Sequence, residues 1–235
     1  MPMGDIPYVL ERSGRRRTVG ITVRPDGTVA VRAPRGLSGE TIDRIVAGKA
    51  GWIRKRLEMN RAREEQNRPK TFSDGEEFPF LGETYRLERV TGLKGVAIMG
   101  DRLCVGTGGR KKTESEEPAM IAARITRWYR HHAAGIITGR VEHYSAHLGL
   151  KPAAVRLKTL KSRWGSCSGR GNLNFNWLLV LAPIHIVDYV VVHELCHFVH
   201  PDHSSRFWDM VESILPDYRE RRKWLRINGA ALHII

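Results

Sequence analysis

The chain has 235 residues, of which 41% are hydrophobic, and this is enough for one large domain or two small ones. No stretch approaches the roughly 20 apolar residues of a membrane-spanning helix, and no apolar run follows the first basic residues as in a signal peptide. The formal net charge of +14 favours an anionic partner such as nucleic acid, although a basic protein that is merely soluble fits it equally well. We therefore expect a cytoplasmic protein without a membrane partner.

The first 70 residues are predicted to form a hairpin and a helix. Residues 18–24 and 28–33 alternate between apolar and polar side chains, and the turn-forming pair Asp26-Gly27 separates them. Ser38 is a suitable N-cap for a helix whose apolar positions recur as far as Leu57. From residue 58 to residue 70 the sequence is charged, so we expect the helix to fray into a linker.

A second short β region is predicted over residues 77–105, with a tight turn at residues 81–83. Residues 106–118 are polar, charged and contain glycine, which is typical of a boundary between domains. We therefore expect an N-terminal β-hairpin and α+β region over residues 1–106 and a hydrolase domain over residues 119–235.

The second expected domain begins with a helical pattern over residues 119–148. A short strand at residues 155–160 and a buried strand at residues 172–181 follow. Pro183 is suited to the first turn of a helix, and we expect this helix to continue until Pro201 ends it. Two more helices are expected to begin at Ser204 or Ser205 and at Pro216. The fold class predicted for the chain is α+β.

The helix after Pro183 carries the run His193-Glu194-Leu195-Cys196-His197. Residues four apart on a helix advance about 400° around its axis, so the two imidazoles lie on one face and can converge on a metal ion such as zinc. Residues 187–192 are mostly apolar, which indicates a buried helix. Burying two imidazoles and a carboxylate without partners would cost several kcal/mol, and a metal removes that cost.

Four residues are candidates for the third ligand: His200, His203, Glu212 and Glu220. On a continuous helix, His200 would lie about 10.5 Å along the axis from His193, which is too far for a shared ion. The turn expected at Pro201 lets His203 approach, so we favour His203. We expect His200 to contact a ligand without binding the ion itself, or to lie on the surface. The expected site holds one zinc ion and a water, with Glu194 as general base.

The three cysteines are odd in number and far apart, which does not indicate a disulfide framework or a cysteine zinc site. Cys196 lies inside the histidine run and is expected to be a packed small side chain. Weak candidates for holding the oxyanion are Tyr218, Arg163 and His200. Hydrogen-bond partners for the ligand histidines are also expected, and apart from Glu194 the candidates near His203 in sequence are Asp202 and Asp209.

The leading hypothesis from these residues is a zinc metallopeptidase that acts on proteins or peptides. A metal-dependent hydrolase of an anionic non-peptide substrate, such as a nucleoside triphosphate, is the alternative, because an activated water can also attack phosphorus. A third interpretation is a DNA- or RNA-binding protein in which the zinc is incidental. The sequence does not indicate an oligomeric state.

The chain resembles the YgjP-like metallopeptidase family, which is related to the SprT-like and WLM zinc proteases. The resemblance is carried by residues 163–167, 172–176, 193–197 and 203–208, and by N-terminal features at residues 15–16, 31–34, 52–53 and 81–82. It implies zinc ligation by His193, His197 and His203, with Glu194 catalytic.

The fold that this resemblance implies is a minimal zincin-like core, in which the histidine helix packs under a small sheet. The edge strand of that sheet would hold an extended substrate. SprT-like and WLM relatives act on proteins crosslinked to DNA, but no DNA-binding module is recognisable in this chain. For residues 163–167 two alternatives stay open: the segment shapes the wall of the site, or it is simply a strand and a turn.

Overall fold

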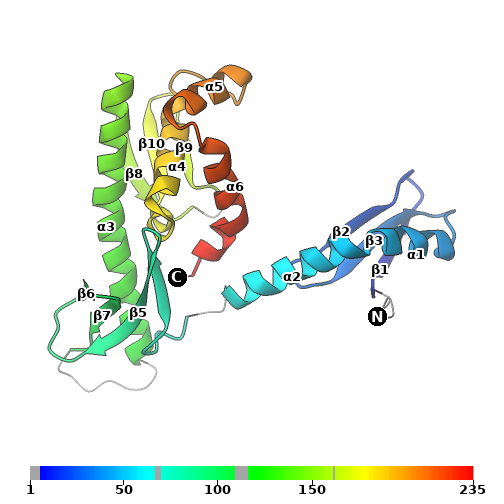
Figure 1. Cartoon of the computed structure of the whole chain (residues 1–235), viewed down its shortest axis with the longest axis horizontal. Helices are drawn as coiled ribbons and strands as arrows, with labels where there is room; N and C mark the ends of the chain where they lie inside the picture. Colours follow the sequence, from blue (N-terminus) through cyan, green and yellow to red (C-terminus); the bar gives the residue numbers. More distant parts are fainter. Residues whose placement is uncertain (1–5, 67–69, 109–115, 161, 235) are drawn as a thin grey trace. The chain divides into compact units, whose positions relative to one another are not determined.

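The computed structural model describes residues 6–66, 70–108, 116–160 and 162–234. It divides the chain into two compact units, Met1–Arg68 and Pro69–Ile235, called unit 1 and unit 2 below. Both units combine strands and helices (Figure 1), so the α+β fold class is confirmed. Within the described residues, no helix is both long and apolar enough to span a membrane.

Unit 1 is a three-stranded sheet with two helices. Its elements are β1 (Val9–Ser13), β2 (Gly20–Val23), β3 (Val29–Pro34), α1 (Gly39–Gly48) and α2 (Ala50–Gln66). The central strand β3 pairs antiparallel with β2, where Ile21 faces Val31, and parallel with β1, where Val9 faces Ala30. The apolar faces of the sheet and helices enclose a core of their own, which includes Val31, Ile42 and Ile53.

The local signals in unit 1 form the structures they predict. In the hairpin turn, the Arg24 N–H donates to the Thr28 carbonyl at 2.8 Å, and the Thr28 N–H donates to the Asp26 carboxylate at 2.9 Å. Gly27 has a φ of 81°, which favours glycine. Ser38 caps α1 by accepting a hydrogen bond from the Thr41 N–H. The predicted hairpin and N-cap are confirmed.

The helical part of unit 1 differs from the expectation. Instead of one helix that frays after residue 58, α1 ends at Gly48 and α2 continues to Gln66. Glycine is a poor helix former, which is consistent with a break beside Gly48, whereas the charged run contains many Glu, Arg and Gln residues of high helix propensity. The expected fraying was wrong because a charged sequence was taken for a linker.

Unit 2 contains two sheets and most of the helices. The four-stranded sheet has the order β4-β5-β7-β6 and the three-stranded sheet has the order β8-β10-β9. The strands are β4 (Glu77–Phe80), β5 (Glu83–Val90), β6 (Val96–Met99), β7 (Arg102–Gly106), β8 (Ala154–Lys158), β9 (Gly165–Cys167) and β10 (Asn172–Asn176). The long helix α3 (Glu116–Leu148) contacts β6, β7 and β8 (Figure 1).

The structure divides the chain at a different place from the boundary expected at residues 106–118. Phe78, Leu87 and Leu103 of the four-stranded sheet share one core with Ile121 and Ile125 of α3. The strands before residue 106 therefore pack with the helix that follows it, although the connecting segment is polar. Part of that segment, residues 109–115, lies outside the described residues.

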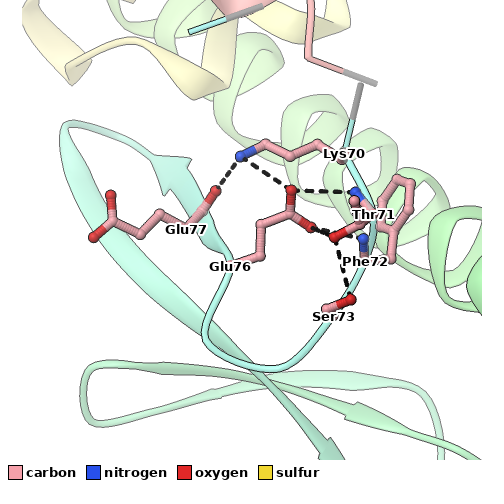
Figure 2. Close-up of polar contacts among 6 residues, drawn as sticks. All are labelled: Lys70, Thr71, Phe72, Ser73, Glu76 and Glu77. Atoms are coloured by element: carbon pink, nitrogen blue, oxygen red, sulfur yellow. Dashed lines mark hydrogen bonds and ion pairs between the residues drawn. The ribbon is translucent and has the colours of Figure 1, made fainter. Parts of the chain in front are cut away.

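The start of unit 2 is organised by the Glu76 carboxylate, as Figure 2 shows. It accepts hydrogen bonds from the Thr71 N–H at 3.2 Å and from the Phe72 N–H at 2.6 Å, and it lies 3.8 Å from Lys70 Nζ. Lys70 also donates to the Glu77 carbonyl at 2.8 Å. These bonds hold Phe72 at a φ of 56°, where its ring packs against the core of unit 2.

The apolar run after residue 176 is a helix and not the expected strand. β10 ends at Asn176, and a 3-10 helix, η1 (Trp177–Leu181), follows. The Asn176 side chain caps this helix, because its carbonyl oxygen accepts from the Leu178 N–H at 3.2 Å and its amide donates to the Leu160 carbonyl at 2.9 Å. Short apolar runs do not distinguish a buried strand from a buried helix by periodicity, which explains the error.

Helix α4 (Ile184–Cys196) begins after Pro183, as predicted, but ends with His197 as its C-cap, before Pro201 is reached. The Phe198 N–H bonds to the Leu195 carbonyl and the Val199 N–H to the Cys196 carbonyl, so the chain tightens after the last turn. The remaining elements are α5 (Ser205–Ile214), α6 (Tyr218–Asn228) and η2 (Gly229–Leu232). Both helix starts expected near Ser204 and Pro216 are confirmed.

Candidate metal centre

Three histidines meet at the end of α4. His193 and His197 lie at the last turn of this helix, and His203 approaches from the segment that follows Pro201. One ring nitrogen from each lies within 4.8 Å of the other two, and the Nε2 atoms of His193 and His203 are 3.1 Å apart. Two nitrogens bound to one tetrahedral zinc ion lie about 3.3 Å apart, so this spacing suits a shared ion.

The orientation of His197 is set by a main-chain group. Its Nδ1–H donates to the carbonyl of His200 at 3.0 Å, which leaves Nε2 as the unprotonated nitrogen. That carbonyl is available because the chain leaves the helix after Cys196. The structure therefore assigns His200 a contact through its backbone, whereas the histidine cluster does not include its side chain.

The two downstream glutamates do not join the cluster. The Glu212 carboxylate is bound by Arg219, with Nη1 and Oε1 2.6 Å apart. Glu220 lies in the first turn of α6 and is exposed. Among the described residues, the group with converging metal-ligand atoms consists of His193, His197 and His203.

Aromatic side chains enclose the cluster from α5. The Phe207 ring stacks on His197 with centroids 4.6 Å apart, and Trp208 lies 5.7 Å from His203. Behind Trp208, Tyr218 stacks at 5.3 Å and the Arg222 guanidinium lies 4.5 Å from the indole. The packing restricts the histidine rings.

The environment favours the neutral form of two of the histidines. Burial, together with the nearby His197, His203 and Arg222, lowers the pKa of His193 to about 3. Burial also lowers the pKa of His203. Neutral imidazole is the form that binds a metal. In the described part of the chain the buried Nδ1 of His193 has no hydrogen-bond partner, so no polar network explains this cluster. Three imidazoles with converging nitrogens fit zinc.

Glu194 lies beside the cluster and is 6% exposed. Burial raises the pKa of its carboxyl group to about 7, while the positive charge of Arg163 and a hydrogen bond from the Cys167 N–H oppose this shift. A buried carboxylate with a pKa near neutrality can both accept and return a proton. Glu194 and the three histidines line a cavity of about 620 Å³, together with Arg163, Gly165, Cys167 and Phe198.

Of the other candidate residues from the sequence, some line this cavity and others lie outside it. Of the three oxyanion candidates, Arg163 lines the cavity, whereas Tyr218 lies behind Trp208. Asp202 accepts a hydrogen bond from the Ser204 N–H at 3.2 Å and so stabilises the turn around His203. Asp209 is exposed on α5. Cys196 is fully buried, and burial raises the pKa of its thiol to about 12.

The sequence model of the YgjP-like metallopeptidase domain matches residues 17–228. The chain belongs to this family. The resemblance stated from the sequence is therefore confirmed, and family membership makes the protein a hydrolase that uses a metal ion and acts on proteins or peptides. No curated protein matches the chain.

A solved structure also matches this metallopeptidase. It is the metallopeptidase zymogen of Pyrococcus abyssi abylysin, which is 26% identical. The match covers 40% of this chain and 92% of that chain, with a TM-score of 0.36.

One group of site residues was left without a definite role by sequence reasoning, and another was missed. Arg163, Gly165, Ser166 and Cys167 line the cavity beside Glu194, whereas the sequence left open whether residues 163–167 shape the site or form only a strand and a turn. Arg222 influences His193 and His203 from α6, and no motif connects it with them. Both contacts arise from the tertiary fold.

Proposed function

We propose that this chain is a zinc metallopeptidase in which His193, His197 and His203 hold one zinc ion and Glu194 is the general base. The observation that carries the proposal is the convergence of three imidazoles beside a buried carboxylate in one cavity. Family membership supports the peptidase part of the proposal. The choice of zinc rests on the donor set of three imidazoles.

A bound zinc ion would activate a water molecule and polarise the scissile carbonyl. Glu194 takes a proton from the attacking water and returns it to the leaving amine. The raised pKa of Glu194 makes its carboxylate a stronger base than an exposed one, and the nearby charge of Arg163 favours the ionised form. Arg163 also faces the cavity, where it can attract an anionic group of the substrate.

The histidines are held in a geometry that is ready for the metal. His197 is oriented by the His200 carbonyl and stacked on Phe207. His193 is fixed by its position on α4, and burial lowers its pKa, so that no proton has to be released when the ion binds near neutral pH. Because the histidine side chains are already ordered, less conformational entropy is lost when the ion binds.

The proposal is tested by comparing the zinc-loaded protein with its Glu194→Gln variant on a mixture of peptides. We expect the variant to bind one zinc ion but to cleave peptides at least about 100-fold more slowly, because general acid–base catalysis contributes that much or more. The His203→Ala variant should lose zinc. The Glu212→Gln variant is the matched control, since Glu212 pairs with Arg219 outside the cluster, and it should keep both zinc and activity.

Equal peptide cleavage by the wild type and the Glu194→Gln variant would overturn the role of Glu194. Full zinc occupancy in the His203→Ala variant would overturn the third ligand. Nucleoside triphosphates are included as substrates. Phosphate release that depends on Glu194, without any peptide cleavage, would replace the peptidase by the phosphoanhydride hydrolase considered above.

A further inference from the structure

Residues 163–167, whose role the sequence left open, pass directly beside Glu194. Gly165 begins β9, an edge strand of the three-stranded sheet, and pairs with Phe175 of β10. A Cβ atom built at Gly165 would lie 2.6 Å from both Cγ and Oε1 of Glu194 and 2.9 Å from its Cδ. Real Cβ atoms essentially never approach another heavy atom within 3.0 Å. The Glu194 side chain therefore occupies the space that a side chain at position 165 would need.

The backbone of Gly165 does not itself require glycine. Gly165 is paired within a strand and is absent from the residues with positive φ, so its backbone conformation is open to other residues. The other glycines of the same wall differ from it. Gly171 has a φ of 72°, and Gly169 has no atom within 4 Å of a built Cβ. Position 165 therefore requires glycine because the Glu194 side chain fills the space that a larger residue would need.

The strand cannot easily move away from Glu194 to make room. The carbonyl of Trp164 accepts a hydrogen bond from the Asn176 N–H at 2.8 Å. The indole of Trp164 is packed against Gly229 so closely that a Cβ there would lie 3.2 Å from Nε1. On the cavity side, the Cys167 N–H is hydrogen-bonded to the Glu194 carboxylate. A side chain added at position 165 would therefore displace Glu194.

We infer that Gly165 is a positioning residue, whose missing side chain lets the Glu194 carboxylate lie against β9 in the cavity that the three histidines also line. This inference rests on the proposed role of Glu194 as general base. The adjacent Cys167 N–H then orients the same carboxylate. The metal ligands are not affected directly, because the three nearest heavy atoms to the built Cβ all belong to Glu194.

The contact is tested by a double-mutant cycle of Gly165→Ala and Glu194→Ala in the full-length, zinc-loaded protein. In the wild-type background, Gly165→Ala should lower the melting temperature by about 4 °C, because it overpacks the site. In the Glu194→Ala background the atoms that clash are gone, so the same substitution should shift it by less than about 1 °C. Gly169→Ala is the matched control and should leave the melting temperature unchanged, since its built Cβ meets open space.

The consequence for catalysis is tested on the Gly165→Ala variant alone. We expect kcat to fall about 100-fold, because a displacement of about 1 Å at a catalytic group costs that much. KM and the zinc content should stay at their wild-type values, which a general loss of structure would not allow. A wild-type kcat in Gly165→Ala would overturn the inference, as would an equal loss of melting temperature in both backgrounds of the cycle.

The two experiments separate this inference from the proposed function. If the wild-type protein cleaves no peptide, the proposed function fails, and the melting cycle still decides whether position 165 and Glu194 compete for the same space. If the wild type is active and the cycle shows no coupling, the inference fails while the peptidase assignment stands.

Discussion

The two units of this metallopeptidase place their polar groups differently. Among the described residues of unit 1, the fully buried core is aliphatic, with Val31 and Ile42 as examples, and the ion pairs around Glu11 lie on the surface. The described part of unit 2 buries four polar or charged residues, namely Ser145, Asn176, Asp188 and Glu194. A buried polar group costs free energy unless it is hydrogen-bonded, so each of these residues needs an explanation.

Three of the buried groups are explained by their partners, and the first of them, Ser145, donates to the Glu142 carbonyl at 3.2 Å. Asn176 caps η1 with one side-chain atom and bonds to Leu160 with the other. Asp188 accepts two hydrogen bonds from Arg140. Glu194 has a single main-chain donor, Cys167, and the buried Nδ1 of His193 has no partner within the described residues. The other buried atom without a partner in the described part of the chain is Oδ1 of Asn174, whose amide nitrogen donates to Ser166 in the wall of the cavity. Incompletely satisfied polar groups of unit 2 therefore lie at the candidate metal centre and in the strand behind its wall.

Among the changes considered, removal of the metal is expected to produce the largest difference in stability between the two units. A chelator should destabilise unit 2 by about 4 kcal/mol if free zinc was held near 1,000 times its dissociation constant. Unit 1 has no part in the histidine cluster and should not respond. Hydrogen exchange followed by mass spectrometry can measure both units in the same sample, using peptides from β3 and from α4.

Two results would contradict this expectation. If β3 lost as much protection as α4, the two units would share one cooperative transition. If neither changed, the three histidines would not hold a metal that matters for stability. The His203→Ala variant serves as the control, because a chelator should have little further effect on a protein that cannot retain the ion.

The next effect concerns the core of unit 1. Ile42 is fully buried there, and Ile42→Ala should cost about 3 kcal/mol through lost burial and the cavity that remains. We expect unit 1 to open in hydrogen exchange while the cleavage of short peptides by unit 2 is unchanged. Val9→Ala is the control, since Val9 is 50% exposed and its truncation should cost less than about 0.5 kcal/mol. A parallel loss of peptidase activity would show that unit 1 supports the site.

The parts of the fold that were predictable depend on local chemistry. The Asp26-Gly27 turn and the Ser38 cap each involve neighbours within a few residues, and both form as predicted. Strand β1 was missed because it is ordered by parallel pairing with β3, some 20 residues away in sequence. A boundary was expected at residues 106–118 because this segment is polar. In the structure Leu103 and Ile125, which lie on either side of it, belong to one core.

The candidate site shows the same limit. His193 and His197 were predicted to lie together because helical spacing alone brings them to one face. His203 required one further assumption, that the chain turns at Pro201, and the structure brings it to the other two. Gly165 gave no signal, because its role depends on Glu194, which is 29 positions later in the chain. A glycine whose space is filled by a distant side chain has no local signature.

The smallest expected effects compare the ion pairs of the two units. Arg140 binds Asp188 through two bonds, Nε to Oδ1 at 2.5 Å and Nη2 to Oδ2 at 3.0 Å, and the Asp188 side chain is only 12% exposed. Asp188→Asn should cost about 2 kcal/mol, because it removes the charge that pairs with a partly buried guanidinium. Glu11 binds Arg24 and Arg32 at 2.9 and 2.8 Å, but its side chain is 40% exposed.

Glu11→Gln should therefore cost less than about 1 kcal/mol, since water screens both ion pairs. Denaturant unfolding of each variant measures these costs, and repeating it at high salt distinguishes their causes. Salt should reduce the small contribution of Glu11 and have less effect on that of Asp188, because screening acts mainly on exposed charges. Equal costs in the two variants would mean that burial does not set the strength of these ion pairs. The contrast between the aliphatic core of unit 1 and the buried polar groups of unit 2 would then have no effect on stability outside the metal centre.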